Sequence, residues 1–367
     1  MILTLFFLTL LTSSNALPST LSPREICTPA SFSNPSKDDT PAILSALQKC
    51  GNGGRILLPK GTTYTIRSPI DLSACQACDF QINGLLGVST DWNFWSGQHA
   101  VFTIISGQAA VIRSDGNTGI INANSYGVTT SYKEPSKTPK LFSITNSSNI
   151  HFSGLKLKNV YGTAFEVTAK TTGMYFYDMD IGTEDSTAPP TDGFQISDAK
   201  HVYINNNTIR ADGACVMLLP NASNVQVEDT TCITSGSTNL GPSGIEFQLV
   251  IGTGLSYVRN ILVKNFRAIG TMNVVALWTG QETREVHTIE IANATFDNVT
   301  MEGPVKQAVY LEQCRPGWCD YKARLNVTGT SFRKFKGAAL KGSEIKCLNK
   351  EDVCGFSEEG WNVKSGG

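Results

Sequence analysis

Two aspartates carry the clearest chemical signal in this chain. Asp192 and Asp212 each precede a glycine, and they lie 20 residues apart in the sequence. Two carboxyl groups held near each other can act as a proton donor and a proton acceptor. An Asp-Gly dipeptide is also a common turn, so each aspartate has a purely structural alternative. The chemistry requires a fold that brings both side chains to one face.

A second set of polar residues interrupts apolar runs. Glu246 and Gln248 alternate with apolar residues in "GIEFQLV", and Tyr310 lies in a later apolar stretch. Residues two apart point to the same side of a strand, so these side chains are candidates for a binding surface. The histidines lie away from these motifs, and we expect surface or turn positions for them; they are His99, His151, His201 and His287. We identify no metal-ligating constellation and no phosphate loop, and therefore expect no metal and no cofactor.

A short repeat indicates how these residues are positioned. Between residues 150 and 300 an apolar residue at i and i+2 is followed by Gly, Asp or Asn at i+4 and a small or apolar residue at i+7. The six units begin at Ile150, Met174, Val202, Val225, Ile261 and Ile289. In the last unit the formula falls on Ile289, Ile291, Asn293 and Phe296.

Each unit is expected to be a strand, a bend and a second strand. The alternation is typical of a strand with one buried face, and the residue at i+4 belongs to the types that tolerate a left-handed backbone. Such units bury their apolar face only by stacking, which predicts a parallel β-helix with coils about 4.8 Å apart. An antiparallel sandwich would show strand spacings of about 8 to 12 residues with hairpin dipeptides. A leucine-rich horseshoe would need a denser leucine pattern.

Composition and the N-terminal segment bound the class of protein. The chain has 367 residues, 41% of them hydrophobic, and a net charge of -1, which argues against a nucleic-acid partner. Residues 2–11 form an apolar run before Ser14-Asn15-Ala16, which predicts a signal peptide over 1–16, secretion and no membrane span. Residues 17–367 are expected to form one domain. A helix capped by Thr40, with Pro41 in its first turn and an end at Gly51, is expected to close the solenoid.

Cysteines and glycosylation sequons are also typical of a secreted protein. The ten cysteines fall into close pairs without a metal-binding pattern and predict five disulfides: Cys27 with Cys50, Cys75 with Cys78, Cys215 with Cys232, Cys314 with Cys319, and Cys347 with Cys354. Six asparagines begin an N-x-Ser/Thr sequon and are candidate glycosylation sites: Asn146, Asn206, Asn221, Asn293, Asn298 and Asn326.

Several stretches resemble one family. They are "GGRILLPKGTTYTI", "KTPKLFSITNSSNIHFSGLKLKNV", "PTDGFQISDAKHVYINNNTI" and the cysteine pair near the C-terminus. Together they resemble glycoside hydrolase family 28, the polygalacturonase and rhamnogalacturonase group of pectin-degrading enzymes. The resemblance spans roughly residues 35 to 360 and implies a right-handed, pectin lyase-like β-helix with the catalytic residues on one stacked face.

The chain departs from most of the motifs of that family. Asn-Thr-Asp becomes Pro190-Thr191-Asp192, and the Asp-Asp before a cysteine becomes Asp212, Gly213 and Ala214 before Cys215. Gly-His-Gly becomes Pro242-Ser243-Gly244, and Arg-Ile-Lys becomes Ala276-Leu277-Trp278. The resemblance therefore implies Asp192 and Asp212 as catalytic residues. It implies substrate-binding positions at Ser243, Ala276 and Trp278, to which Glu246, Gln248 and Tyr310 are added.

These departures bear on the substrate. An inverting glycosidase needs a protonated carboxyl and an ionised carboxylate about 6.5 to 9.5 Å apart. Asp192 and Asp212, about one coil apart, could reach that spacing with Asp192 as base or water-positioning group and Asp212 as acid. Replacing the Arg and Lys removes charge-assisted hydrogen bonds of roughly 1.5 to 3 kcal/mol each to a galacturonate carboxylate. Plain polygalacturonate is therefore not the expected substrate.

Three hypotheses follow. The first is a secreted, monomeric hydrolase of a pectic or related polysaccharide. The second is a recruited scaffold that binds a small hydrophobic metabolite and guides a step such as a cyclisation, because Gly213, Ser243, Ala276 and Trp278 suit a polyanion less well. The third is a carbohydrate-binding protein without catalysis.

Overall fold

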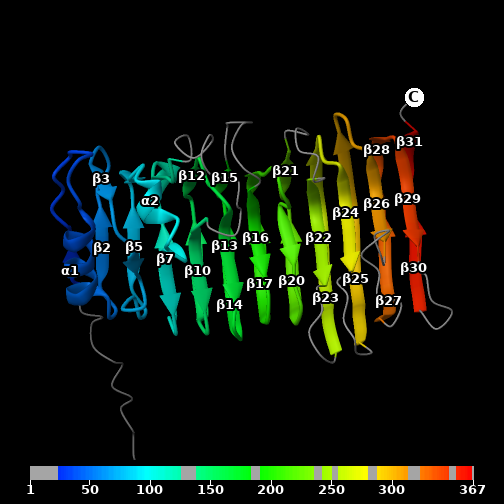
Figure 1. Cartoon of the computed structure of the whole chain (residues 1–367), viewed down its shortest axis with the longest axis horizontal. Helices are drawn as coiled ribbons and strands as arrows, with labels where there is room; N and C mark the ends of the chain where they lie inside the picture. The colour runs from blue at the N-terminus through cyan, green and yellow to red at the C-terminus, as the bar shows by residue number, and fades with distance from the viewer. Residues whose placement is uncertain are drawn as a thin grey trace, which may run out of the picture.

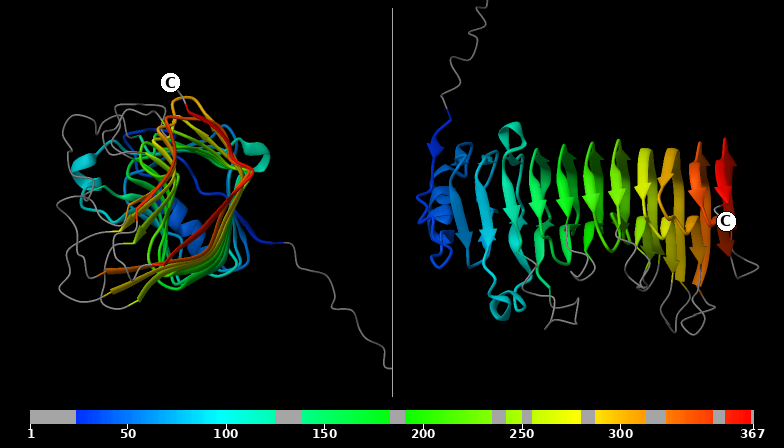
Figure 2. Two further views of the ribbon diagram at one scale, coloured as in Figure 1. Left: turned by 90° about the vertical axis from the view of Figure 1, so that its right-hand side faces the viewer. Right: turned by 90° about the horizontal axis from the view of Figure 1, so that it is seen from above.

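The computed structural model describes residues 24–124, 138–182, 191–234, 242–249, 255–279, 287–312, 323–346 and 353–365. These residues form an elongated stack of coils that begins with β1–β3 and ends with β29–β31 (Figure 1). The end-on view shows the coils superimposed around a common interior (Figure 2). The described strands pair in parallel, as in the predicted right-handed parallel β-helix.

Three stacks of parallel strands form the faces of the cylinder. The first stack contains β1 (Ile26–Cys27), β2 (Arg55–Leu58), β5 (Asp79–Ile82), β8 (Val111–Arg113), β11 (Ser148–Ser153), β14 (Thr171–Tyr177), β17 (Ala199–Asn205), β20 (Ala222–Glu228), β23 (Leu255–Ile269), β25 (His287–Glu302), β27 (Ala323–Arg333) and β30 (Val353–Glu359). The second contains β3 (Thr63–Ile66), β6 (Leu85–Val88), β9 (Ile120–Asn122), β12 (Lys156–Lys158), β15 (Asp180–Gly182), β18 (Thr208–Arg210), β21 (Thr231–Ile233), the later parts of β23 and β25, β28 (Lys336–Ala339) and β31 (Asn362–Ser365).

The third stack is a separate ten-stranded sheet, called the site sheet below. Its strands, in spatial order, are β4 (Ile70–Asp71), β7 (Ala100–Ile105), β10 (Lys140–Thr145), β13 (Thr163–Thr168), β16 (Asp192–Ile196), β19 (Val216–Leu218), β22 (Ser243–Leu249), β24 (Asn273–Thr279), β26 (Gln307–Glu312) and β29 (Lys341–Lys346). In the described ranges the remaining elements are two short helices, α1 (Thr40–Cys50) and α2 (Trp92–Trp95), and a 3-10 turn at Asp115–Asn117.

The register of the coils follows the repeat in the sequence for five of its six units. Their first residues pair in the order Ile150, Met174, Val202, Val225 and Ile261. Their i+7 residues also pair in order: Leu157, Ile181, Ile209, Cys232 and Ala268. The residues at i+4 adopt a left-handed backbone, with φ of 67° at Gly154 and 54° at Asp178. The apolar positions therefore stack on one another from coil to coil.

The sixth unit lies five residues later than predicted. Ala294 pairs with Ile261, Phe296 with Val263 and Met301 with Ala268, so the unit begins at Ala294 and not at Ile289. Asn293 also fits the formula, because it follows an alternating apolar pair and its backbone is left-handed, with a φ of 56°. Its side-chain amide donates to Asn260 Oδ1 at 3.2 Å, which places it on the bend before the unit.

Apolar side chains fill the inside of the cylinder. Phe102, Phe142, Phe165 and Phe194 are fully buried, and successive rings stack with centroids 4.6, 5.1 and 5.2 Å apart. These four residues come from β7, β10, β13 and β16 of the site sheet. The stack fixes the position of the coils whose outer sides form the candidate site.

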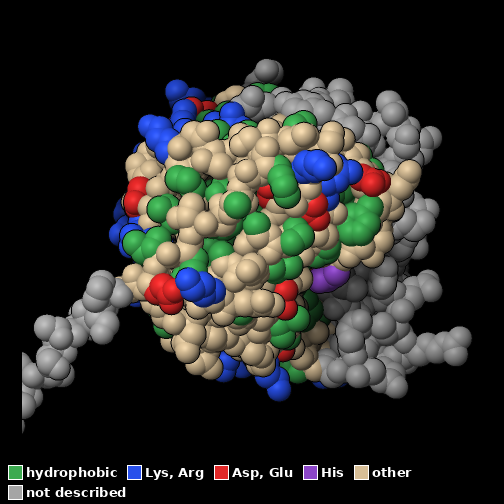
Figure 3. Space-filling model, turned by 90° about the vertical axis from the view of Figure 1, so that its left-hand side faces the viewer, with side chains coloured by type: hydrophobic (Ala, Val, Ile, Leu, Met, Phe, Trp, Pro, Cys, Tyr) green, Lys and Arg blue, Asp and Glu red, His purple; other side chains and the backbone are tan. Residues whose placement is uncertain are grey.

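The N-terminal end is closed as expected, with one correction. Helix α1 buries Ile43 and Leu47 against the first coil. The space-filling view of this end shows a closed surface of mainly backbone and side chains that are neither charged nor hydrophobic, with scattered hydrophobic side chains, rather than an open apolar interior (Figure 3). The N-cap is Asp39 and not Thr40. The Asp39 carboxylate does not cap the helix, because it accepts the backbone N–H groups of Phe32 and Thr65 at 2.7 Å each.

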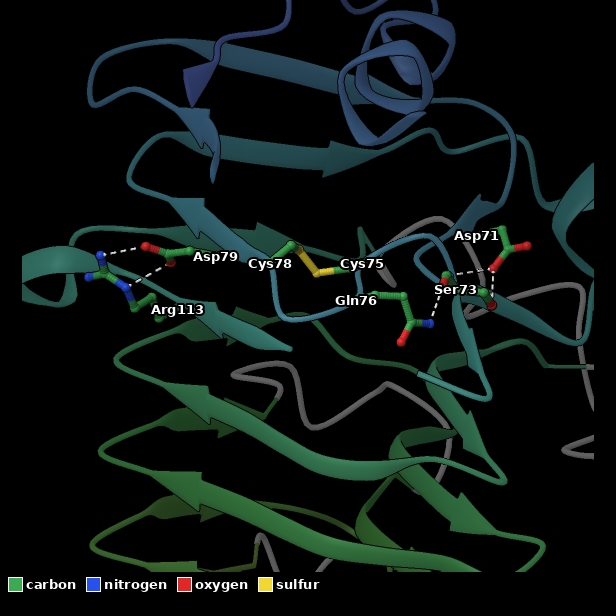
Figure 4. Close-up of a disulfide and its surroundings, with 7 residues drawn as sticks. All are labelled: Asp71, Ser73, Cys75, Gln76, Cys78, Asp79 and Arg113. Carbon is green, nitrogen blue, oxygen red and sulfur yellow. Dashed lines mark hydrogen bonds and ion pairs between the residues drawn. A yellow bond between two sulfur atoms is a disulfide. The ribbon is translucent and has the colours of Figure 1, made fainter. Parts of the chain in front are cut away.

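Disulfides join Cys27 to Cys50, Cys75 to Cys78 and Cys215 to Cys232, and Cys354 is also disulfide-bonded. Around the Cys75–Cys78 bond, Asp79 binds Arg113, and Gln76 donates to the Ser73 carbonyl (Figure 4). Residues 1–16 and three cysteines, Cys314, Cys319 and Cys347, lie outside the described part of the chain. Within the described ranges no helix is long and apolar enough to cross a membrane.

Candidate functional site

The site sheet gathers the predicted functional residues. Asp192 begins β16, β22 carries Ser243, Glu246 and Gln248, β24 carries Ala276 and Trp278, and β26 carries Tyr310. Asp212 lies just outside the sheet, in the connection between β18 and β19. The fold therefore brings residues that are more than 100 positions apart in the sequence to one face of the cylinder.

A continuous line of side chains, called the outer row, crosses this sheet. In β22 and β24 the core residues Ile245, Phe247, Val275 and Leu277 alternate with Glu246 and Ala276, which therefore point away from the core. Pairing in register extends this line through Ser143, Glu166, Gln195, Met217, Glu246, Ala276, Tyr310 and Glu344. Three predicted binding positions thus stand side by side on the outer row.

A second line, the entry row, runs where the strands of the sheet begin. It contains the first residues of seven strands: Lys140, Thr163, Asp192, Ser243, Asn273, Gln307 and Lys341. Thr163 pairs with Asp192, and Ser243 with Asn273 and then Gln307. Ser243, Asn273 and Gln307 are buried polar residues. Asp192 is therefore one member of a polar edge.

Asp192 is held by two hydrogen bonds. The backbone N–H of Ala214 donates to its Oδ1, and the side-chain Nε2 of Gln195 donates to its Oδ2, both at 2.8 Å. The side chain is half-buried. A carboxylate oxygen has two lone pairs, so each oxygen keeps one for a further partner. The arrangement orients the carboxylate and leaves it able to accept a proton.

The electrostatic surroundings raise the pKa of Asp192. Desolvation by burial is the largest cause and raises the pKa. The hydrogen bonds from Ala214 and Gln195 and the charge of Lys140 act in the opposite direction without cancelling it. Burial favours the neutral form of a carboxyl group, and a base with a higher pKa holds a proton more strongly.

The segment from Asp212 to Ala214 runs beside Asp192. Gly213 N–H donates to the Thr191 carbonyl at 3.0 Å, and Cys215 N–H donates to the Ser243 carbonyl at 3.0 Å. Asp212 as a whole residue is only 5% exposed. These bonds place the two aspartates on neighbouring coils, about 4.8 Å apart along the cylinder.

The predicted binding residues differ in exposure. Ser243 and Ala276 are fully buried, while Glu246, Gln248 and Tyr310 are half-buried. The backbone of Trp278 pairs with Gln248 in register, but the position of its side chain lies outside what the structure describes.

A polar cluster that the sequence motifs did not predict lies on the N-terminal side of Asp192. His99 Nε2 lies 3.0 Å from Glu166 Oε2, and Ser143 Oγ donates to the same carboxylate oxygen at 2.7 Å. His99 is an exposed residue in the bend before β7, as expected from the sequence, and it also contacts Ser143 and Glu166 of the outer row. Lys140 Nζ lies nearby, 3.4 Å from Thr163 Oγ1 and 3.5 Å from Gln195 Oε1.

A signal for part of this cluster was present in the sequence. Ser143, Glu166 and Gln195 each stand between two buried apolar residues of a strand, the same pattern that selected Glu246. Recognising Lys140 and His99 required the tertiary structure, because each lies at the start of its strand or just before it.

One group of potential metal ligands occurs among the described residues. It consists of Glu25, Cys27 and Cys50. The two sulfurs of this group are joined to each other in a disulfide, so they are not available as thiolate ligands.

The chain is similar to fungal hydrolases along most of its length. The model of "Glycosyl hydrolases family 28" matches residues 55–367. The "Probable endo-xylogalacturonan hydrolase A" of Aspergillus niger is 30% identical over 364 residues, covering 95% of this chain and 87% of that protein. The endo-xylogalacturonan hydrolase A of Aspergillus tubingensis is 29% identical over 360 residues, covering 95% and 87%.

Solved structures show the same architecture. The crystal structure of the endo-xylogalacturonan hydrolase from Aspergillus tubingensis superimposes with a TM-score of 0.83 at 28% identity, covering 93% of both chains. The polygalacturonase from Erwinia carotovora has a TM-score of 0.65 at 15% identity, covers 96% of both chains and shows the likeness of the fold alone. From the family match across residues 55–367, the chain belongs to glycosyl hydrolase family 28.

Proposed function

We propose that this protein is a secreted, glycosylated hydrolase that cleaves a glycosidic bond in a substituted pectic polysaccharide of the xylogalacturonan type. The observation that carries the proposal is the Asp192 carboxylate, which is oriented by two hydrogen bonds on the site sheet and has a raised pKa. Relatives that share about 30% of its residues bear the name of an endo-xylogalacturonan hydrolase.

Asp192 acts as the base that activates water. Its two oxygens each accept one hydrogen bond from the protein and retain a lone pair for the attacking water. The raised pKa strengthens the base without requiring a second carboxylate beside it. Ionised Asp192 therefore removes a proton from water as that water attacks the anomeric carbon.

Asp212 supplies the acid in this proposal. Its segment is bonded to the residues around Asp192 through Gly213 N–H and the Thr191 carbonyl. Neighbouring coils about 4.8 Å apart allow two carboxyl groups to reach the separation of about 6.5 to 9.5 Å that leaves room for water. The proton of Asp212 passes to the leaving glycosidic oxygen, and the sugar product has inverted configuration.

The outer row favours a substituted chain over plain polygalacturonate. Ala276 lies directly between Glu246 and Tyr310 and is fully buried, so the described residues of this part of the row offer a carboxylate and a phenol and no cation. A carboxylate and a phenol bind sugar hydroxyl groups, and the aromatic ring packs on a sugar face.

The test is hydrolysis by the purified protein of xylogalacturonan, the same polymer stripped of xylose, and polygalacturonate. Release of reducing ends from xylogalacturonan above the other two polymers is expected. Asp192→Asn should reduce this rate by about 10²- to 10⁴-fold, the usual contribution of a general base. Asp198→Asn, six residues further along the same coil, is the matched control and should retain the rate. Binding of pectin without any release of sugar would instead identify a carbohydrate-binding protein.

A further inference from the structure

Lys140 is the cation nearest to Asp192 on the entry row. It begins β10, and Thr163 begins β13 between it and Asp192, so two strand spacings, or about 9.6 Å, separate their backbones along the cylinder. Its charge is close enough to lower the pKa of Asp192, although burial outweighs this effect. Lys140 therefore belongs to the surroundings of the proposed base.

The ammonium group of Lys140 has weak partners within the protein. Its two hydrogen bonds, to Thr163 Oγ1 and Gln195 Oε1, are long at 3.4 and 3.5 Å, and both acceptors are neutral. No carboxylate of the described residues forms an ion pair with it, although the side chain is half-buried. An ammonium group has three donors and gains most from a charged acceptor.

Lys341, at the other end of the entry row, provides a direct contrast. Its Nζ lies 3.0 Å from Glu344 Oε2, so its charge is already neutralised within the protein. Glu166, the acidic residue of the outer row nearest to Lys140, is occupied by His99 and Ser143. Glu166 therefore binds His99 and Ser143 and does not neutralise the charge of Lys140.

We infer that Lys140 binds the carboxylate of a uronate unit, in a subsite on the N-terminal side of the bond that is cleaved. This inference rests on the proposed function for the identity of the polymer. The chain has Ala276 and Trp278 where its family resemblance places cations, and Lys140 supplies a positive charge five strands away on the same sheet. His99, Ser143 and Glu166 lie beside it with the donors and acceptors that sugar hydroxyl groups require.

The experiment distinguishes binding of the uronate carboxylate by Lys140 from an indirect effect of Lys140 through Asp192. Binding is measured by calorimetry in an Asp192→Asn background, with an oligogalacturonate and with the same oligomer after its carboxyl groups are reduced to alcohols. Lys140→Met should weaken binding of the charged oligomer about tenfold or more, as expected for one charge-assisted hydrogen bond. It should change binding of the reduced oligomer less than twofold. Lys140→Arg should recover most of the affinity.

Lys341→Met is the matched control, because it removes a lysine of the same row that Glu344 already neutralises. It should change the affinity for the charged oligomer less than twofold. An equal loss on both oligomers would assign Lys140 a positioning role and overturn the inference, as would undetectable binding of the charged oligomer or no effect of Lys140→Met. Hydrolysis by the unmodified protein tests the proposed function separately. Charge-selective binding without hydrolysis would reject that function and leave the subsite in place.

Discussion

Gly213 leaves the space that the Asp192 carboxylate occupies: a Cβ atom on Gly213 would lie 2.3 Å from Asp192 Oδ1. The neighbouring Ala214 N–H donates to the same oxygen. The absence of a side chain at position 213 is therefore part of how the carboxylate is positioned.

Gly213→Ala should lower kcat on the accepted polymer by about 10²-fold, because a small displacement of a catalytic group has an effect of that size. The matched control is Gly342→Ala, on the same sheet, where an added Cβ has no atom within 4 Å. Steady-state kinetics on both variants is the measurement. Unchanged kcat for Gly213→Ala would show that Asp192 takes no part in the rate-determining chemistry.

The hydrogen bond from Gln195 lowers the pKa of Asp192. Asp192 acts as base only when ionised, so activity should rise with pH through its pKa, with a midpoint above the ordinary aspartate value of 3.8. Gln195→Leu removes the donor and should move that midpoint to higher pH. The pH profile of kcat/KM for both proteins is the measurement, and a midpoint that stays in place or falls would contradict the assignment of this limb to Asp192.

The same pKa predicts how stability changes with pH. Because the folded state raises the pKa of Asp192, the folded protein binds this proton more tightly than the unfolded chain does. The contribution of Asp192 to stability is thus complete below about 3.8, the unfolded value, and is lost as pH rises through the folded pKa. Urea unfolding across this range should show a smaller decline for Asp192→Asn than for the original protein. Equal declines would mean that burial at Asp192 does not shift its titration.

Two disulfides should differ in their effect on stability. Cys215–Cys232 closes a sequence separation of 17 residues and Cys75–Cys78 one of 3, and all four sulfurs are buried. Loop-closure entropy gives about 3 kcal/mol for the first and about 1.6 kcal/mol for the second. The double variant Cys215→Ala/Cys232→Ala should therefore lose more free energy of unfolding than Cys75→Ala/Cys78→Ala. The reverse order in urea unfolding would show that native packing, and not loop length, dominates.

The sequence by itself determined the repeating unit, because a strand, a left-handed bend and a second strand depend on local alternation and on residues such as Gly154 and Asp178. It also indicated Glu246 as an outward residue, since a side chain between two core residues of a strand points to the opposite face of the sheet. Where Ile289 and Ile291 extended the alternation, the local pattern was ambiguous, and only pairing with β23 fixed the register of the sixth unit.

Tertiary structure alone decided what surrounds Asp192. Ala214 and Lys140 come from coils on opposite sides of β16, and Gly213 leaves room that no local pattern reveals. Their contacts depend on how successive coils align, which is set by the lengths of the loops and by stacking in the core. The sequence contains these residues but does not give the distances between them. Gln195 is a neighbour in the same strand, but only the stacked coils bring Ala214 and Lys140 to the carboxylate and bury it enough to raise its pKa.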